Sequence, residues 1–176
     1  MENLETDRLK LRLPTEGDAV FIQSLYNTEG FLRFVGDKHI RSRGDAVEYI
    51  RNNMLAMREA KSVCLLVVES KSDSKQLGVC GLIKRDELDA YDIGYGFMPD
   101  SFGQGYGLEA GQAVVEYARK RSDIEELVAI TSSDNEASKS LINRLGFTYV
   151  KVESKVSDTI DLLLYRLPLN NHETHP

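Results

Sequence analysis

Four glycines stand within eleven residues, in the segment SFGQGYGLEAG at positions 101–111, and an amphipathic pattern typical of a helix follows directly. Glycine weakens a helix, so glycines at a helix start indicate that another molecule comes very close to this backbone. The first turn of a helix offers unpaired N–H groups and a partial positive charge, which together bind phosphate. The segment therefore predicts a phosphate-binding loop, although composition alone leaves a flexible loop before an ordinary helix as the alternative.

Three kinds of phosphate-binding loop compete for these glycines. A nucleoside triphosphatase loop needs Lys-Ser or Lys-Thr after its last glycine, and Leu108-Glu109 stands there instead, which excludes it. The stretch GYGLEA, residues 105–110, matches the dinucleotide fingerprint, but that fingerprint follows its strand directly and opens a repeating βαβ series. Pro99 and several loop residues intervene here, and antiparallel strands are expected upstream, which disfavours the dinucleotide interpretation.

The elements that must hold the loop follow from hydrophobic periodicity. Leucines alternate up to Pro14, which predicts a strand, and helices are expected from Thr15 to about Asn27 and from about Asp45 to Ala60. The remaining elements are helices after the glycines and at 133–146, and strands at 62–70, 76–85, 90–98, 126–132, 147–154 and 159–167. The order is therefore β-α-α-β-β-β-α-β-α-β-β, an α/β (α+β) arrangement in which helices cover the faces of a mixed sheet.

Three stretches of the chain resemble one known family. QGYGLEA after DIGYGFMPDSF resembles the coenzyme A loop of the GNAT N-acetyltransferases, whose pattern is Arg/Gln-x-x-Gly-x-Gly/Ala: Gln104 and Gly107 match, and Glu109 occupies the last small position. LETDRLKLRLPTEGDA and DNEASKSLINRLGF resemble the RimJ/RimL-like branch, which acetylates ribosomal-protein N-termini and related amines. With three motifs in the family's order and spacing, the chain is identified as a member of the GNAT superfamily.

The resemblance implies a GNAT fold, with a largely antiparallel central sheet of about seven strands, as a single domain over residues 1–168 before a polar tail at 169–176. It also implies acetyl-CoA as the cofactor, held by N–H groups of the loop and by the strand before Pro99, which would also supply the oxyanion donor. The alternative for that strand is ordinary hydrogen bonding within the sheet. The alternative for Asn135 is a role as a helix cap. The implied cofactor-binding residues are Phe97, Met98, Gln104, Gly105, Tyr106, Gly107, Leu108, Asn135 and Ser138.

Acetyl transfer from a thioester to an amine needs a neutral amine, a stabilised oxyanion and a protonated leaving thiolate. By the resemblance, Asp92 stands where some family members carry a catalytic glutamate. It alternates with Gly94 and Gly96 on one strand face, which would leave room for substrate. Asp92 is expected to help deprotonate the amine, with a solvated strand aspartate as the alternative, and the backbone of Met98 is the candidate oxyanion contact.

The leaving thiolate depends on a different segment. Many family members use a tyrosine seven residues after the asparagine that matches Asn135, and Ile142 stands there in this chain. The resemblance to the ribosomal branch then makes Ser138 the candidate acid. The alternative is a purely structural role, because Ser138 would stand at the third position of a helix capped by Asn135. Ile142 also keeps open a non-catalytic acyl-CoA sensor of the same fold.

The acceptor is expected beside the loop at 29–43, where this family closes over its substrate. Phe31 and Phe34 are the candidate substrate-binding residues, with core packing as the alternative, whereas Tyr91 and Tyr95 are assigned to the core. The predicted function is transfer of acetyl to a primary amine, either a protein N-terminus or a small molecule, by direct attack on the thioester. A dinucleotide-dependent oxidoreductase is the remaining alternative.

Composition limits the partners. The net charge is −6 without a Lys- or Arg-rich block, which argues against a nucleic-acid surface. The charged opening and the short longest aliphatic run, residues 63–68, argue against secretion and membrane insertion, so a cytoplasmic protein is expected. Cys64 and Cys80 lack metal-ligand spacing and are expected to be buried reduced thiols, so no metal is expected. A homodimer is left open.

Overall fold

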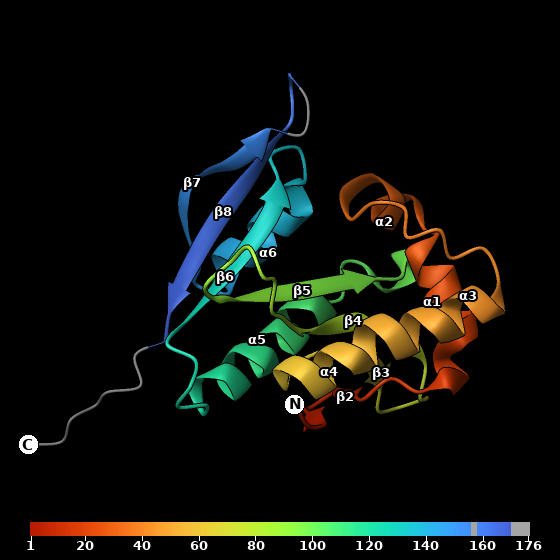
Figure 1. Ribbon diagram of the computed structural model, residues 1–176. Coiled ribbons are helices and arrows are strands. Elements are labelled where there is room, and N and C mark those ends of the chain that lie inside the picture. Colours follow the sequence, from red (N-terminus) through yellow and green to blue (C-terminus); the bar gives the residue numbers. More distant parts are fainter. Residues whose placement is uncertain (156–157, 170–176) are drawn as a thin grey trace, which may run out of the picture.

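A single sheet of eight strands organises the computed structural model, which describes residues 1–155 and 158–169 (Figure 1). The spatial order is β1-β2-β3-β4-β5-β6-β8-β7, and every neighbouring pair is antiparallel except β5 and β6, which are parallel. The predicted mixed, largely antiparallel sheet is confirmed, and the short β1 is an addition to it. The strands are β1 Leu4–Glu5, β2 Leu9–Arg12, β3 Leu65–Ser70, β4 Gln76–Ile83, β5 Tyr91–Phe97, β6 Glu126–Ser132, β7 Thr148–Lys155 and β8 Asp161–Pro168.

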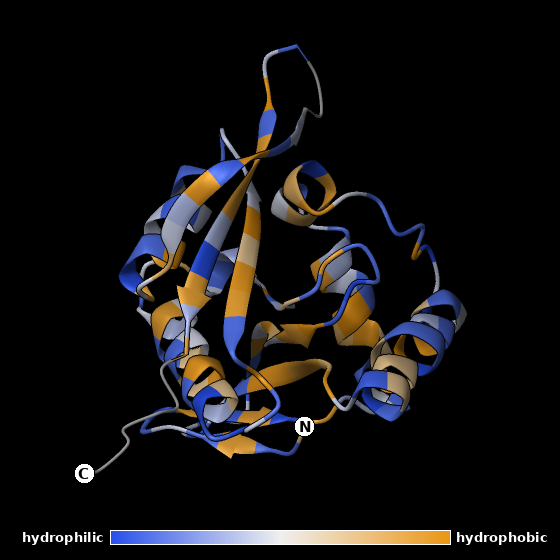
Figure 2. Cartoon of the chain, turned by 60° about the vertical axis from the view of Figure 1, so that its left-hand side comes forward, coloured by the Kyte–Doolittle hydropathy of each residue, from blue (hydrophilic) through white to orange (hydrophobic). Residues whose placement is uncertain are grey.

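Helices cover both faces of the sheet, as the hydrophobic pattern predicts. On β4, Leu82 packs into the cluster that contains residues of α5, while Val79, three positions earlier, packs into the cluster of α1 and α3 on the other face. Figure 2 shows hydrophobic residues concentrated on the central strands, with hydrophilic residues on the outward sides of the helices. The helices are α1 Ala19–Tyr26, α2 Glu29–Phe34, α3 Arg43–Tyr49, α4 Ala56–Lys61, α5 Tyr106–Arg119 and α6 Glu136–Arg144.

Two helical segments differ from the sequence expectation. A π-helical stretch, Ile50–Leu55, joins α3 to α4, so the helix predicted over 45–60 has a widened turn in its middle. The expected loop at 29–43 begins with the short helix α2, because the Thr28 side chain accepts a hydrogen bond from the Phe31 amide and Phe31 is buried against the core. Six residues are too few for a helical period to stand out in the sequence.

The strands β5 and β6 separate soon after they meet. Their pairing is limited to Tyr91 with Leu127 and Asp92 with Val128, and Figure 1 shows the two strands running apart from there. Over residues 93–97, β5 therefore keeps its partner β4 on one edge, while its other edge is left without a strand. The divergence opens a space in the middle of the sheet, and the functional residues gather around it.

The last described residue of the chain packs against the domain. Leu169, which the predicted tail included, is buried, and its amide donates to the Glu125 carbonyl at 2.8 Å. The rest of that predicted tail, 170–176, lies outside the described residues. Cys64 and Cys80 are both free and buried, as expected. None of the described helices combines the length and hydrophobicity that crossing a bilayer requires.

Candidate active site

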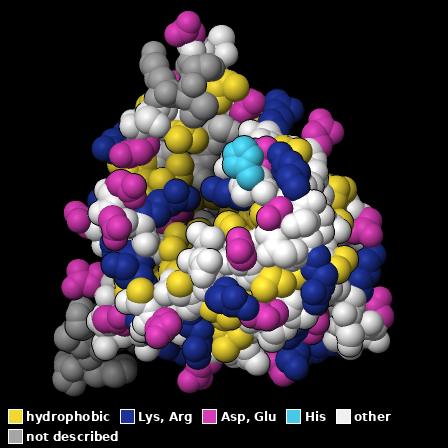
Figure 3. All heavy atoms as spheres, turned by 45° about the vertical axis from the view of Figure 1, so that its right-hand side comes forward, with side chains coloured by type: hydrophobic (Ala, Val, Ile, Leu, Met, Phe, Trp, Pro, Cys, Tyr) yellow, Lys and Arg dark blue, Asp and Glu magenta, His cyan; other side chains and the backbone are white. Residues whose placement is uncertain are grey.

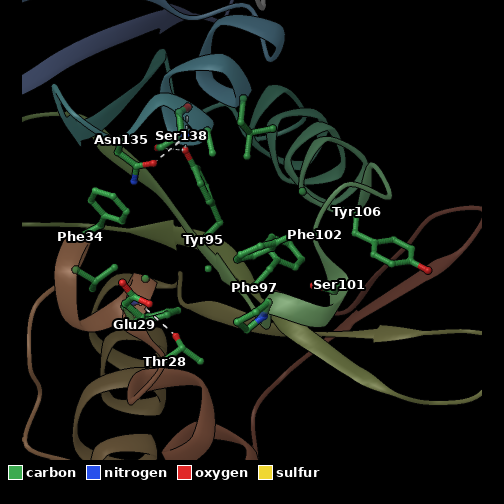
Figure 4. A pocket seen from close by; sticks show the side chains of 18 of the residues that line it. Thr28, Glu29, Phe34, Tyr95, Phe97, Ser101, Phe102, Tyr106, Asn135 and Ser138 are labelled. Carbon is green, nitrogen blue, oxygen red and sulfur yellow. Dashed lines mark hydrogen bonds between the residues drawn. The ribbon is translucent and has the colours of Figure 1, made fainter.

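A cavity of about 540 Å³ lies between β5, α2 and the first turns of α5 and α6 (Figure 4). Figure 3 shows hydrophobic side chains gathered around a hollow on the face to which α2 belongs. The predicted site residues that line the cavity are Phe31, Phe34, Phe97, Gly105, Tyr106, Gly107, Asn135 and Ser138. Those that do not line it are Asp92, Met98, Gln104 and Leu108. Segments far apart in the sequence thus meet around one space.

The N-terminus of α5 points free amides at this cavity. Gly105 precedes the helix in a left-handed conformation, with φ +80°, and no side chain caps it. The first intrahelical bond runs from the Glu109 amide to the Gly105 carbonyl at 3.1 Å, so the amides of Tyr106, Gly107 and Leu108 have no acceptor within the helix. Together with the helix dipole, these groups can bind a diphosphate.

Arg8, which the sequence analysis did not single out, holds the glycine loop from outside the cavity. Its guanidinium donates to the Gln104 carbonyl at 2.9 Å and to the Glu109 carboxylate at 3.1 Å. It also lies 4.6 Å from the centre of the Tyr106 ring. The Thr6 hydroxyl donates to the same carboxylate at 3.0 Å, so Glu109 faces β2 and its charge is balanced. A pairing across 101 residues leaves no local pattern in the sequence.

The backbone of β5 offers one free edge to the cavity. The Met98 amide donates to the Leu77 carbonyl at 2.8 Å, and the Met98 carbonyl accepts from the Ser101 amide at 3.0 Å. Alternate residues of an antiparallel strand turn their amides to opposite edges, so the Phe97 amide points to the edge that β6 leaves uncovered. Met98 is therefore held in the sheet ladder, and Phe97 is the group that can donate to a developing oxyanion.

Tyr95 and Ser138 form a hydroxyl pair in the cavity wall. Their oxygen atoms are 2.5 Å apart, and both residues line the cavity (Figure 4). Burial raises the pKa of the Tyr95 phenol to about 12, so it is protonated at neutral pH. Ser138 also has its structural role, because its amide donates to the capping Asn135 side chain at 3.1 Å. The core assignment of Tyr95 is thus corrected: its ring packs against the core, but its hydroxyl reaches the site.

Asp92 lies apart from the cavity in a buried ion pair. Asp92 is only 3% exposed, and its carboxylate accepts a hydrogen bond from the Arg85 guanidinium at 2.9 Å. Burial raises the pKa of Asp92 to about 6, although Arg85 opposes the shift. The alternative of a solvated strand aspartate is therefore wrong, because the carboxylate is buried, while the expected role of Asp92 in deprotonating the amine stays a prediction.

The room expected beside Asp92 is filled by protein side chains. A Cβ atom at Gly94 would come within 2.8 Å of Ile83, and one at Gly96 within 2.1 Å of the Phe31 ring. Phe31 also packs on Tyr26, with ring centres 4.5 Å apart. The glycines make room for core side chains rather than for substrate. Phe31 lines the cavity, as expected, and also packs in the core, as the alternative had it.

An Asp92→Asn variant is expected to be more stable than the wild type at pH 7.5. The folded-state pKa of about 6 lies above the ordinary value of 3.8, so the folded protein binds this proton more tightly than the unfolded chain. The associated stability is present below about pH 4 and is lost as the pH rises to about 6. A neutral amide avoids that loss, which is worth about 1–3 kcal/mol, while the half-exposed Arg85 regains water.

Thermal unfolding at pH 4 and pH 7.5 measures this difference. The advantage of Asp92→Asn should shrink towards zero at pH 4, where the wild-type carboxyl is protonated. Asp37→Asn is the control, because this exposed carboxylate pairs with Arg41 and its pKa is lowered to about 2, so no gain is expected. A variant less stable than the wild type at pH 7.5 would mean that the Arg85 pair outweighs desolvation.

The chain is similar to known proteins over most of its length. The family model described as "Acetyltransferase (GNAT) domain" matches residues 8–148. The protein named "Uncharacterized N-acetyltransferase YoaA", from Bacillus subtilis (strain 168), is 28% identical over 145 residues, covering 82% of this chain and 81% of its own length.

Two solved structures share the fold. The ribosomal L7/L12 α-N-protein acetyltransferase RimL, in complex with coenzyme A, aligns with a TM-score of 0.84 at 19% identity and covers 97% of this chain and 100% of its own. The microcin C7 self-immunity acetyltransferase MccE, in complex with acetyl-CoA and AMP, aligns with a TM-score of 0.78 at 20% identity and covers 93% of each chain. With the family model matched over most of its length, the chain belongs to the GNAT acetyltransferase family and is an acetyltransferase.

Proposed function

We propose that the protein transfers acetyl from acetyl-CoA to a primary amine by direct attack of the amine on the thioester. The observation that carries the proposal is the cavity that joins the free amides of α5, the uncovered edge of β5 and the Ser138 hydroxyl. Acetyl-CoA would supply the acetyl group as an activated thioester. In the reaction a C–N bond forms, the C–S bond breaks, the amine loses a proton and the sulfur gains one.

Each part of the cavity has one task in this proposal. The amides of Tyr106, Gly107 and Leu108 bind the diphosphate, which anchors the cofactor at the end of α5. The Phe97 amide donates to the carbonyl oxygen as negative charge develops on it. The Ser138 hydroxyl donates a proton towards the departing sulfur, and the Tyr95 hydroxyl, 2.5 Å away, supports it through their hydrogen bond.

The proposal assigns no base to Asp92. An α-amine with a pKa of about 8 is substantially neutral at cellular pH and needs little help to lose its proton. A lysine amine, with a pKa near 10.4, would cost roughly 3 kcal/mol more to deprotonate. The absence of Asp92 from the cavity lining therefore favours an acceptor whose amine has a low pKa.

A thiol-release assay with acetyl-CoA against a panel of primary amines tests the proposed function. Turnover of at least one amine, dependent on both substrates, is the expected result. Tight coenzyme A binding without any turnover would favour the acyl-CoA sensor that Ile142 kept open. Heat protection by NAD rather than by coenzyme A would contradict the proposal and revive the dinucleotide alternative.

Replacing Arg8 by alanine is expected to raise KM for acetyl-CoA about fivefold and to leave kcat within about twofold. Arg8 acts through the loop that it holds, and a half-exposed pair of this kind contributes about 1 kcal/mol, which corresponds to that change. Arg8→Lys should recover only part of the loss, since a lysine lacks the planar fork. Arg51→Ala, which removes an exposed Arg–Glu pair remote from the loop, is the control. A fall in kcat at unchanged KM would contradict the positioning role.

A further inference from the structure

We infer that the acceptor is a primary amine whose substituent is apolar and uncharged, and that the Glu29 carboxylate binds its ammonium group, which gives its proton to solvent before the amine attacks the thioester. The inference rests on the proposed acetyl transfer and narrows its substrate. It takes the end of the cavity near α2 as the acceptor end, because the diphosphate is assigned to the opposite end, at α5. Figure 4 shows Glu29 and Phe34 on α2, across the cavity from Tyr95 and Ser138.

Glu29 is an unpaired carboxylate in a cavity wall that holds few charges. The charged residues that line the cavity are Glu29 and Arg33. Arg33 is engaged, because its guanidinium donates to Asp134 at 3.1 Å and lies 4.8 Å from the centre of the Phe34 ring. Within residues 1–155 and 158–169, no hydrogen bond or ion pair is made by the Glu29 carboxylate. A cationic ligand would therefore find its counter-ion at Glu29.

Part of the cavity lining is apolar and open to solvent. Val35 is 46% exposed and Phe102 is 63% exposed, and both line the cavity together with the half-buried Phe34. Val35 and Phe34 come from the end of α2, while Phe102 comes from the loop before α5. At the acceptor end, an aliphatic or aromatic substituent would cover Phe34 and Val35 and remove apolar surface from water.

Three hydroxyl-bearing side chains of the cavity, Thr28, Ser101 and Ser138, are already engaged with the protein. The Thr28 hydroxyl donates to the Leu25 carbonyl at 2.8 Å, and the Ser101 hydroxyl donates to the Met98 carbonyl at 2.7 Å. Ser138 is paired with Tyr95, as described above. An amino sugar needs several free polar partners for its hydroxyl groups, because a buried hydroxyl without one is costly. The wall provides few: within the described residues, the Asn135 amide nitrogen and the Tyr106 hydroxyl are the neutral side-chain groups of the lining that make no hydrogen bond.

A polyamine is disfavoured by the charge count. Each of its ammonium groups would need a carboxylate, whereas Glu29 is the acidic residue among those that line the cavity. One carboxylate beside an apolar surface suits one ammonium group with an apolar substituent. A peptide with an apolar first residue also has the α-amine of low pKa that the proposed function favours, whereas a free arylalkylamine shares only the apolar substituent, and the experiment separates them.

Acceptor kinetics at saturating acetyl-CoA test the inference with phenethylamine, a tripeptide that begins with phenylalanine, spermidine and glucosamine. At least one of the first two should exceed the last two in kcat/KM by about tenfold or more. Preference for phenethylamine would identify a small-molecule acceptor, and preference for the tripeptide a protein N-terminus. A preference for spermidine or glucosamine would overturn the inference while leaving the acetyltransferase proposal intact.

Glu29→Gln should raise KM for the preferred amine about tenfold and leave KM for acetyl-CoA unchanged. Added salt should raise the amine KM of the wild type and have a smaller effect on the variant, because an exposed ion pair is screened. The control is Glu59→Gln, an exposed carboxylate on α4 remote from the cavity. An unchanged amine KM in Glu29→Gln would overturn the role of Glu29. No turnover of any amine would overturn the proposed function and the inference with it.

Discussion

Replacement of Ser138 by alanine is expected to lower kcat by about 100-fold while KM for acetyl-CoA stays within about threefold. The change removes a hydroxyl in the cavity wall that can give the departing sulfur its proton. It leaves the Ser138 amide in place, so the cap that Asn135 provides at 3.1 Å persists and α6 should still form. Steady-state kinetics with varied acetyl-CoA at saturating amine measure both constants.

The hydroxyl pair predicts a specific pattern among related variants. Tyr95→Phe should lower kcat about tenfold, because it removes the partner 2.5 Å from Ser138 without touching the serine. The double variant should be no slower than Ser138→Ala, since Tyr95 acts through Ser138. Ser140→Ala, at an exposed position on the same helix, should have no effect. Full kcat in Ser138→Ala would show that the sulfur leaves without this acid.

Gly105→Val is expected to weaken coenzyme A binding by about 100-fold or more, which calorimetric titration would measure. Gly105 has φ +80°, a conformation that costs a β-branched residue about 1–2 kcal/mol. A side chain there would also approach the Arg8 guanidinium, which lies 3.4 Å from the position that a Cβ atom would occupy. The backbone would relieve this strain by turning the amides before α5 away from the diphosphate.

Gly36→Val is the matched control for that prediction. Gly36 also has positive φ, +102°, and nothing lies within 4 Å of a Cβ added there. It should lower the melting temperature for the same backbone reason, yet leave coenzyme A affinity unchanged because it lies outside the cavity lining. Equal affinity losses in both variants would mean that the loop amides have no special role in binding.

The sequence was informative wherever a local rule applied. Two positive-φ glycines, Gly103 and Gly105, lie in the loop where the glycine spacing predicted a phosphate site. Asn135 caps α6 as its position before the helix predicted. The family resemblance and the order of elements are confirmed by the family model and by the sheet. The binding and catalytic roles of these residues stay predictions that the variants above address.

The sequence was uninformative where distant segments meet. Tyr95 looked like a core residue because strand alternation predicts the face of the sheet on which its side chain lies, but not which element covers that face. The first turn of α6 covers it and places the Ser138 hydroxyl 2.5 Å from the Tyr95 hydroxyl, although the two residues are 43 positions apart in the sequence. Asp92 looked accessible because it alternates with Gly94 and Gly96 on one strand face, yet Phe31 fills the space at Gly96.

By itself, the sequence determined the backbone of the site: glycines that permit left-handed turns, a helix start with free amides, and a family whose chemistry suits them. Only the tertiary structure decided which side chains face the cavity, because that depends on where β5 and β6 part. It also decided that Arg8 holds the loop and that the Glu29 carboxylate finds no partner among residues 1–155 and 158–169. Local conformation is set by neighbours along the chain, whereas burial and pairing are set by neighbours in space.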